Sequence, residues 1–316
     1  MNQTRLILDV DTGIDDALAI LYALKAPNVV IEGITTIFGN VDVEQATENT
    51  LRLLTLAQPG YEIPVAVGAG TALAKKTAGY ATGVHGENGI GGVELASSSQ
   101  QPVQETAAEF IVRIAKENPG EIVLVTLAHL TNLSHALELE PNLKNLLKKV
   151  VVMGGTVFRP GNKTPVAEAN IWGDPEAADH VFTSGLPLTM VGLDVTQKTV
   201  ITREHLNLLQ RQGREENREI IAFMEESLSH YFKFYQEVNY FIESAPLHDP
   251  LALMVALQPD LVTTRQMKVR VECKGEHTAG MVVADLRPQP KVGEFIEVAV
   301  EVDTERAVGV FLSAFI

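Results

Sequence analysis

The sequence is poor in cysteine, in positive charge and in long apolar runs, and each shortage excludes a class of protein. Its one cysteine, Cys273, excludes an intramolecular disulfide and a zinc site built on cysteines. The 25 Lys and Arg residues face 40 Asp and Glu residues, and the resulting net charge of −15 disfavours nucleic acid and anionic membranes as partners. No apolar stretch approaches the ~20 residues that a membrane span needs. We therefore expect no nucleic-acid or membrane partner.

The chain also begins without the basic segment and apolar continuation of a signal peptide, because residues 6–8 already have the pattern of a core strand. This beginning and the lone cysteine favour the reducing cytoplasm as the compartment. Hydrophobic residues make up 46% of the 316 residues and charged residues 21%, which supplies a buried core and excludes a disordered or fibrous chain. No linker rich in proline or serine interrupts the sequence, so we expect a single domain over residues 1–316.

Short apolar runs alternate with amphipathic helical patterns along the first two-thirds of the chain. Strands are predicted at 5–10, 29–36, 63–68, 121–127, 149–154 and 187–195, and helices at 14–25, 42–57, 104–117, 131–139 and 174–184. Further helices are predicted at 203–212, 215–235, 250–257 and 304–314, and late strands at 267–273, 279–284 and 294–302. Apolar strands separated by helices predict an α/β fold, with an open, mostly parallel, doubly wound (Rossmann-like) mixed sheet.

Four acids fall in one stretch of eight residues, 9–16, at the end of the first predicted strand, in LILDVDTGIDDALAIL. Residues two apart on a strand share a face, so Asp9 and Asp11 are expected to point the same way, while Asp15 and Asp16 lie in the first turn of a helix. In a doubly wound fold this point is the carboxyl end of a strand, where ligands bind. Helix capping explains only one or two of the acids. Four carboxylates without a cation would repel one another, so the cluster predicts a hard divalent ion, Ca²⁺ or Mg²⁺.

Other polar residues follow strands or begin helices further along the chain. Asn40 follows the second strand, and Glu168 and Asn170 lie two apart in VAEAN; a turn asparagine and solvated loop residues are the simpler interpretations of these. His248 and Asp249 precede Pro250 at a helix start, which fits an N-cap beside a proton donor. Two long polar loops, 69–101 and 155–172, are of the kind that is usually functional or mobile.

Aromatic residues at near-helical spacing favour core packing over a ligand-binding wall; they are Tyr231, Phe232, Tyr235 and Tyr240.

A phosphatase of the haloacid dehalogenase type is one alternative, because such enzymes also have Asp-x-Asp after a strand. Gly173-Asp174 with Asp179 superficially supplies its second motif, but Asp174 precedes Pro175 and is well explained as a helix N-cap. Spacing excludes an EF-hand, and the chain has neither a Walker-type motif nor a GxGxxG after a strand.

Taken in order, these segments resemble the inosine–uridine-preferring nucleoside hydrolase family. The resemblance rests above all on DVDTGIDDA, which is highly specific to that family. It extends through FGN (38–40), VHGENGIGG (84–92), LTNLSHALELEP, VVVMGGTV, VAEANIWGDPEAADHVF, GLDVT (192–196) and HDPLAL. It implies a mixed, largely parallel sheet with one Ca²⁺ at its carboxyl edge, and hydrolysis of the N-glycosidic bond of ribonucleosides to free base and ribose. Homodimers or homotetramers are usual for the family.

The resemblance also implies roles for individual residues. The carboxylates of Asp11, Asp16 and Asp249 would bind calcium, and Leu127 would add a backbone carbonyl. Of the remaining residues, Asp15, Asn40 and Asn170 would hold the ribose hydroxyls or the water, Glu168 with Asn162 would meet the 5′-hydroxyl, Met153 would lie against the sugar, and His248 would contact the leaving base. The chain departs from the family pattern at Ala128-His129, where Gly-Pro or Gly-Gly is common, and at Ala169, where an aromatic residue is common.

Hydrolysis of an N-glycoside passes through an oxocarbenium-like cation and needs a base for the water and a proton for the leaving group. Asp11 is the predicted general base and His248 the first candidate acid, with His85 in the Gly-rich loop as the second. The competing class is a non-catalytic, calcium-stabilised ribose-binding module. Purine and pyrimidine nucleosides both stay open as substrates. No Lys or Arg lies in the matched motifs near the ribose, which disfavours 5′-nucleotides.

Overall fold

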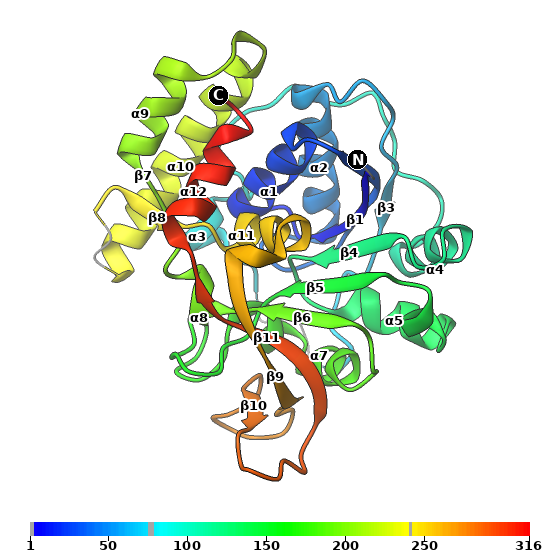
Figure 1. Cartoon of the computed structure of the whole chain (residues 1–316). Helices are drawn as coiled ribbons and strands as arrows, with labels where there is room; N and C mark the ends of the chain where they lie inside the picture. The colour runs from blue at the N-terminus through cyan, green and yellow to red at the C-terminus, as the bar shows by residue number, and fades with distance from the viewer. Residues whose placement is uncertain (1–2, 75–78, 240–241) are drawn as a thin grey trace.

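The computed structural model describes residues 3–74, 79–239 and 242–316, and a nine-stranded sheet forms its centre (Figure 1). The strands are β1 (Thr4–Val10), β2 (Val29–Thr36), β3 (Val65–Val67), β4 (Ile122–Thr126), β5 (Lys149–Met153), β6 (Leu188–Val191), β9 (Val262–Val271), β10 (Val282–Asp285) and β11 (Glu294–Val302). Their order is β10-β9-β11-β6-β5-β4-β1-β2-β3. Strands from β11 to β3 run parallel, and β9 pairs antiparallel with both β10 and β11. The predicted mostly parallel mixed sheet is confirmed.

Helices cover both faces of the sheet. They are α1 (Ile14–Lys25), α2 (Val43–Ala57), α4 (Ala107–Glu117), α5 (Thr131–Leu139), α7 (Pro175–Phe182), α9 (Arg203–Gln212), α10 (Arg218–Asn239), α11 (His248–Leu257) and α12 (Thr304–Ser313). Leu6 and Leu8 of β1 pack into one core with residues of α1, α2 and α11, and Ile7 packs into a second core with α4, α5 and α7. This alternation is what a strand buried on both faces requires. No helix of the described residues is long and apolar enough to cross a membrane.

Most predicted elements have the expected bounds, and the differences have local causes. The strand predicted over 187–195 ends at Val191, and Leu193–Thr196 forms a short helix, α8. Strand β9 begins five residues before the predicted 267, because residues 263–266 are exposed and show no apolar alternation. The short elements α3 (Thr82–His85), α6 (Ala169–Gly173), β7 (Val200–Thr202) and β8 (Ser244–Pro246) were not predicted, since three to five residues carry no measurable periodicity.

The strand order places a ligand-binding edge at the centre of the sheet. From β1 the chain steps outward through β2 to β3, then returns to the other side of β1 and steps outward through β4, β5 and β6. The two βα crossovers beside this reversal diverge, which leaves a crevice at the carboxyl ends of β1 and β4. Asp11, Asn40, Leu127 and Met153 all stand at or just beyond the carboxyl ends of these central strands.

Candidate active site

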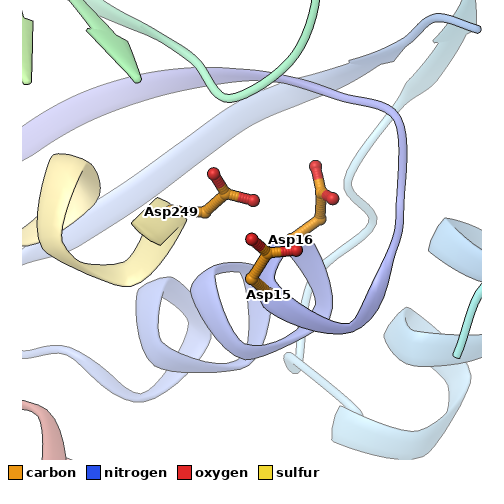
Figure 2. A group of neighbouring side chains, drawn as sticks. All are labelled: Asp15, Asp16 and Asp249. Carbon is orange, nitrogen blue, oxygen red and sulfur yellow. The ribbon is translucent and has the colours of Figure 1, made fainter. Parts of the chain in front are cut away.

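Three carboxylates from two helices meet in the crevice. One oxygen each of Asp15, Asp16 and Asp249 lies within 4.8 Å of the others, and all three residues are buried. Figure 2 shows Asp15 and Asp16 in the first turn of α1 and Asp249 in the first turn of α11, with their carboxylates facing a common space. Asp16 also closes the turn that precedes α1, since it accepts the backbone N–H of Gly13 (2.8 Å) and of Asp11 (3.2 Å).

Asp11 lies beside this group and is held by Asn40. The backbone N–H of Asn40 donates to Asp11 Oδ2 (2.8 Å), and its Nδ2 donates to Asp11 Oδ1 and to Asp16 Oδ2, both at 3.1 Å. Gly39 makes this approach possible, because a Cβ at that position would come within 1.9 Å of Asp11 Oδ2. The asparagine after β2 therefore bridges two acids of the cluster, and is more than a turn residue.

Asp9 does not join the cluster, and the expectation that it faces the site with Asp11 is wrong. Strand β1 ends at Val10, so the two-residue alternation does not continue to Asp11. Asp9 points into the opposite core, where its Oδ1 accepts the hydroxyl of Thr35 and Nδ2 of Asn132 (2.8 Å). It stabilises the packing of β2 and α5 beneath the site.

The acids of the site repel one another in a place from which water is largely excluded. Burial, and then the charge of Asp15, raise the pKa of Asp16 from 3.8 to about 7. Burial and the neighbouring acids also raise the pKa of Asp11 and of Asp249 well above the usual value. Oδ1 of Asp15 is buried without a hydrogen-bond partner. Oxygen ligands, an unpartnered carboxylate oxygen and raised carboxyl pKa values all fit a hard divalent cation, which would relieve the repulsion.

The segment after β5 supplies amide and carboxylate groups to the same crevice. Nδ2 of Asn170 donates to the carbonyl oxygens of Leu127 (2.8 Å) and Met153 (3.2 Å). Glu168 caps α6, since it accepts backbone N–H groups of Gly155 (2.9 Å), Asn170 (2.9 Å) and Ile171 (3.2 Å). Burial is the largest influence on Glu168 and raises the pKa of its carboxyl to about 7.

Asn162 holds the loop that precedes α6, because its Oδ1 accepts the backbone N–H of Ala169 (3.0 Å). Its own side chain lines the cavity described below.

A tyrosine and a histidine form a buried hydrogen-bonded pair on the other side of the crevice. Nε2 of His248 lies 3.0 Å from the hydroxyl of Tyr235, and Nδ1 lies 2.8 Å from the hydroxyl of Thr196. Burial lowers the pKa of His248 to about 4, so the ring is neutral at neutral pH. Tyr231 donates to Oδ2 of Asp15 (3.3 Å).

His85 reaches the crevice from α3. Its Nδ1 accepts the backbone N–H of Ile14 (3.0 Å), so the neutral ring carries its proton on Nε2. Its ring lies 5.5 Å from that of Tyr231, and burial lowers its pKa.

One cavity of about 370 Å³ unites these groups, a size suited to a small ligand. Its walls contain all the predicted site residues except Asp11 and Asp16, which lie behind Asn40 and Asp15. Ten lining residues lie outside the predicted set, and the polar or aromatic ones among them are Lys163, Gln197, Tyr231, Phe234 and Tyr235.

The expectation that the aromatic residues of α10 only pack in the core is wrong for Tyr231 and Tyr235, because helical periodicity cannot show that a buried face borders a cavity. Tyr240 lies outside the described residues. The matched motifs near the ribose contain no Lys or Arg, but Lys163, outside those motifs, lines the cavity and places its Nζ 5.2 Å from the centre of the Trp172 ring.

The acids on which the phosphatase alternative depends lie elsewhere. Asp174 caps α7 through Ala177 N–H (3.1 Å) and accepts the hydroxyl of Thr131 (2.7 Å), and Asp179 pairs with Arg270. Neither lines the cavity.

The chain is similar to known proteins over most of its length. Residues 6–309 match the inosine-uridine preferring nucleoside hydrolase family. The chain is 39% identical over 276 residues to uridine nucleosidase 1 of Arabidopsis thaliana, covering 86% of this chain and 79% of that protein. It is 38% identical over 280 residues to the pyrimidine-specific ribonucleoside hydrolase RihA of Salmonella paratyphi C (strain RKS4594), covering 89% and 88%.

A solved structure, the purine-preferring ribonucleoside hydrolase from Gardnerella vaginalis, superposes with a TM-score of 0.91 at 36% identity and with 98% of each chain covered. The fold is that of a nucleoside hydrolase. The chain belongs to the inosine–uridine preferring nucleoside hydrolase family.

Proposed function

We propose that this protein hydrolyses the N-glycosidic bond of ribonucleosides to free base and ribose in a calcium-dependent reaction. The observation that carries the proposal is that one cavity brings together the acid cluster, the Glu168–Asn170 segment and the Tyr235–His248 pair. A ribose placed between the first two would direct its base toward the third. A binding module has no need of a buried proton-carrying pair at that position.

Asp16 and Asp249 are common to the observed group of acids and to the ligand set that the resemblance implies. We propose that they hold the calcium with Asp11 and the Leu127 carbonyl, and that Asp15 turns its unpartnered Oδ1 to a ribose hydroxyl. When bound, calcium supplies a positive charge that binds hydroxyl oxygens and lowers the pKa of water.

We assign each residue of the site a separate role in bond cleavage. Asp11, whose carboxylate Asn40 fixes on both oxygens, accepts a proton from the attacking water. The amide groups of Asn40 and Asn170 orient the water and the ribose hydroxyls for in-line attack. Glu168, with Asn162 nearby, meets the 5′-hydroxyl. The buried carboxylates favour the positive charge that develops on the sugar.

The leaving base receives its proton through the Tyr235–His248 pair. Because the His248 ring is neutral and both of its nitrogens are engaged, it acts with Tyr235, which lines the cavity and reaches the base. Thr196 Oγ1, 2.8 Å from Nδ1, holds the ring so that Nε2–H stabilises the phenolate left on Tyr235, and a water in the cavity then returns the proton to Tyr235. The sequence predicts His248 as the first candidate acid, whereas in this proposal the proton reaches the base from Tyr235.

The named relatives include uridine and pyrimidine-specific enzymes as well as a purine-preferring one. We propose uridine among the substrates, because the Arabidopsis relative is a uridine nucleosidase and the Salmonella relative is a pyrimidine-specific hydrolase. From the resemblance we also propose a cytoplasmic homodimer or homotetramer.

The test is a steady-state screen of inosine, adenosine, guanosine, uridine and cytidine with saturating Ca²⁺, in which released reducing sugar is measured. We expect release from at least uridine, and loss of release in Asp11→Asn. Binding of nucleosides without release of sugar would support the ribose-binding module and overturn the proposal.

A further inference from the structure

His129 lies where three loops of the site meet. It follows β4 two residues after Leu127, and its buried ring contacts the loop after β2 and the short helix α6. It is not among the residues that line the cavity, so it has no direct route to substrate. The three segments it joins carry Leu127, Asn40 and Asn170.

One polar contact of His129 is with the main chain of Asn170. Nδ1 lies 3.1 Å from the carbonyl oxygen of Asn170, and because a carbonyl only accepts, Nδ1 carries the proton. Helix α6 has five residues, and the last carbonyls of a helix have no partner within it. The imidazole therefore supplies a donor to a carbonyl at a helix end. The side chain of the same asparagine reaches back to the Leu127 carbonyl at 2.8 Å, so Asn170 is tied to the 127–129 segment at both ends.

The imidazole ring of His129 packs closely between Phe38 and Gly173. The centre of its ring lies 4.8 Å from that of Phe38 at an angle of 63°, an edge-to-face arrangement, and Phe38 precedes Asn40 by two residues. On the other side Gly173 leaves room, because a Cβ there would lie 2.1 Å from Cε1 of His129. A side chain at 173 and the imidazole exclude each other.

We propose that His129 is a positioning residue, which fixes Asn170 and Asn40 relative to the Leu127 carbonyl and so sets the orientation of the ribose for attack. The inference rests on the proposed function, because it assigns those three groups to the sugar and the metal. Displacement of a positioning contact by about 1 Å costs up to ~10² in rate even far from the chemistry.

The first test compares His129→Ala, His129→Asn and His129→Gln on uridine or on whichever nucleoside is cleaved. We expect kcat to fall ~10- to 10²-fold in the alanine variant. Asparagine places an amide N–H where Nδ1 is and should recover most of that loss. Glutamine places its amide near Nε2 and should not. The two amide variants should have similar Tm values, so a role in folding alone would leave them equally active.

The second test uses Gly173→Ala, whose methyl group would displace the ring. Its backbone is not in the left-handed region, so alanine adds no strain of its own. We expect it to lower kcat in the wild-type background and to have little further effect in His129→Ala, because the ring it displaces is gone. His135→Ala, on the adjacent helix α5 and outside the cavity, is the matched control and should keep wild-type kcat.

The inference is overturned if His129→Ala keeps kcat within twofold, if the asparagine and glutamine variants are equally active, or if the His129 and Gly173 losses simply multiply. Failure of the proposed function has a different signature, since the wild-type protein would then release no sugar from any of the five nucleosides.

Discussion

The Nε2 atom of His248 lies 3.0 Å from the hydroxyl oxygen of Tyr235, and this hydrogen bond couples α11 to α10 in the wall of the cavity. Because burial holds the pKa of His248 near 4, the two residues can deliver a proton only as a pair. We expect His248→Ala and Tyr235→Phe to slow nucleosides by ~10²–10⁴, the usual value of general acid catalysis. Both should leave p-nitrophenyl riboside nearly unaffected, since nitrophenolate departs without a proton. The measurement is kcat on both substrates at saturating Ca²⁺.

Phenylalanine retains the ring of Tyr235, so that variant controls for packing. If both substrates lost rate together in both variants, His248 would act by steadying its neighbour Asp249. His85 or solvent would then be the better candidate for the acid.

Substitutions of Asp11 and of Asp15 should affect different steps, catalysis for Asp11 and sugar binding for Asp15. Asp11→Asn keeps the size of the side chain but removes a base and an anionic ligand, so kcat should fall by at least ~10² and calcium affinity should also fall. Asp15→Asn should chiefly raise KM, because Asp15 is assigned to a ribose hydroxyl. Calcium titration by calorimetry, with steady-state kinetics on each variant, measures both effects. A greater loss of calcium affinity in Asp15→Asn than in Asp11→Asn would reverse the two assignments.

Calcium and pH should have linked effects on stability. The folded pKa values of Asp16 and Glu168 are about 7, above their ordinary 3.8 and 4.5, so the folded chain holds more protons than the unfolded chain between those values. The stability of the metal-free protein should therefore be greatest at low pH and fall as pH rises through 7. Tm of dialysed, metal-free protein should increase from pH 8 to pH 6.

Added Ca²⁺ should raise Tm more at pH 8 than at pH 6, because protons compete for the same carboxylates. A metal-free preparation that kept full activity at pH 8 would contradict the calcium site.

A nucleoside that carries a 5′-phosphate should be a poor substrate. Glu168 is expected at the 5′-hydroxyl, and a phosphate there would face the buried carboxylates of a poorly solvated cavity. We expect kcat/KM for inosine 5′-monophosphate to be about 10²-fold below that for inosine. Lys163, which lines the same cavity, provides the control: if it admits the phosphate, the two substrates will have comparable kcat/KM and Lys163→Ala will restore the difference.

The sequence predicted what depends on periodicity and on specific motifs. Helix α1, strand β2 and strand β11 have their predicted bounds because each is long and has one dominant pattern. The residues of DVDTGIDDA lie at the predicted edge because the parallel sheet leaves them no other place. The sequence could not show that Asp9 points away, because its partners Thr35 and Asn132 come from β2 and α5.

The same limit applies to Tyr235. Its role depends on His248, thirteen residues away and in another helix, while its spacing along α10 is that of an ordinary core residue. Contacts that form only after elements far apart in the chain have packed leave no trace in local pattern.

Asp16 holds the turn before α1 and lies beside three other acids, so the side chain that we propose as a calcium ligand is also part of the scaffold. The N–H groups of Asp11 and Gly13 donate to different oxygens of Asp16, so an asparagine there, with one amide oxygen, could accept only one of them. Selection for the fold alone would therefore retain aspartate at this position, despite the repelling charge. A descendant that no longer needed the reaction should keep Asp16 for longer than Asp15, whose Oδ1 has no hydrogen-bond partner in the fold.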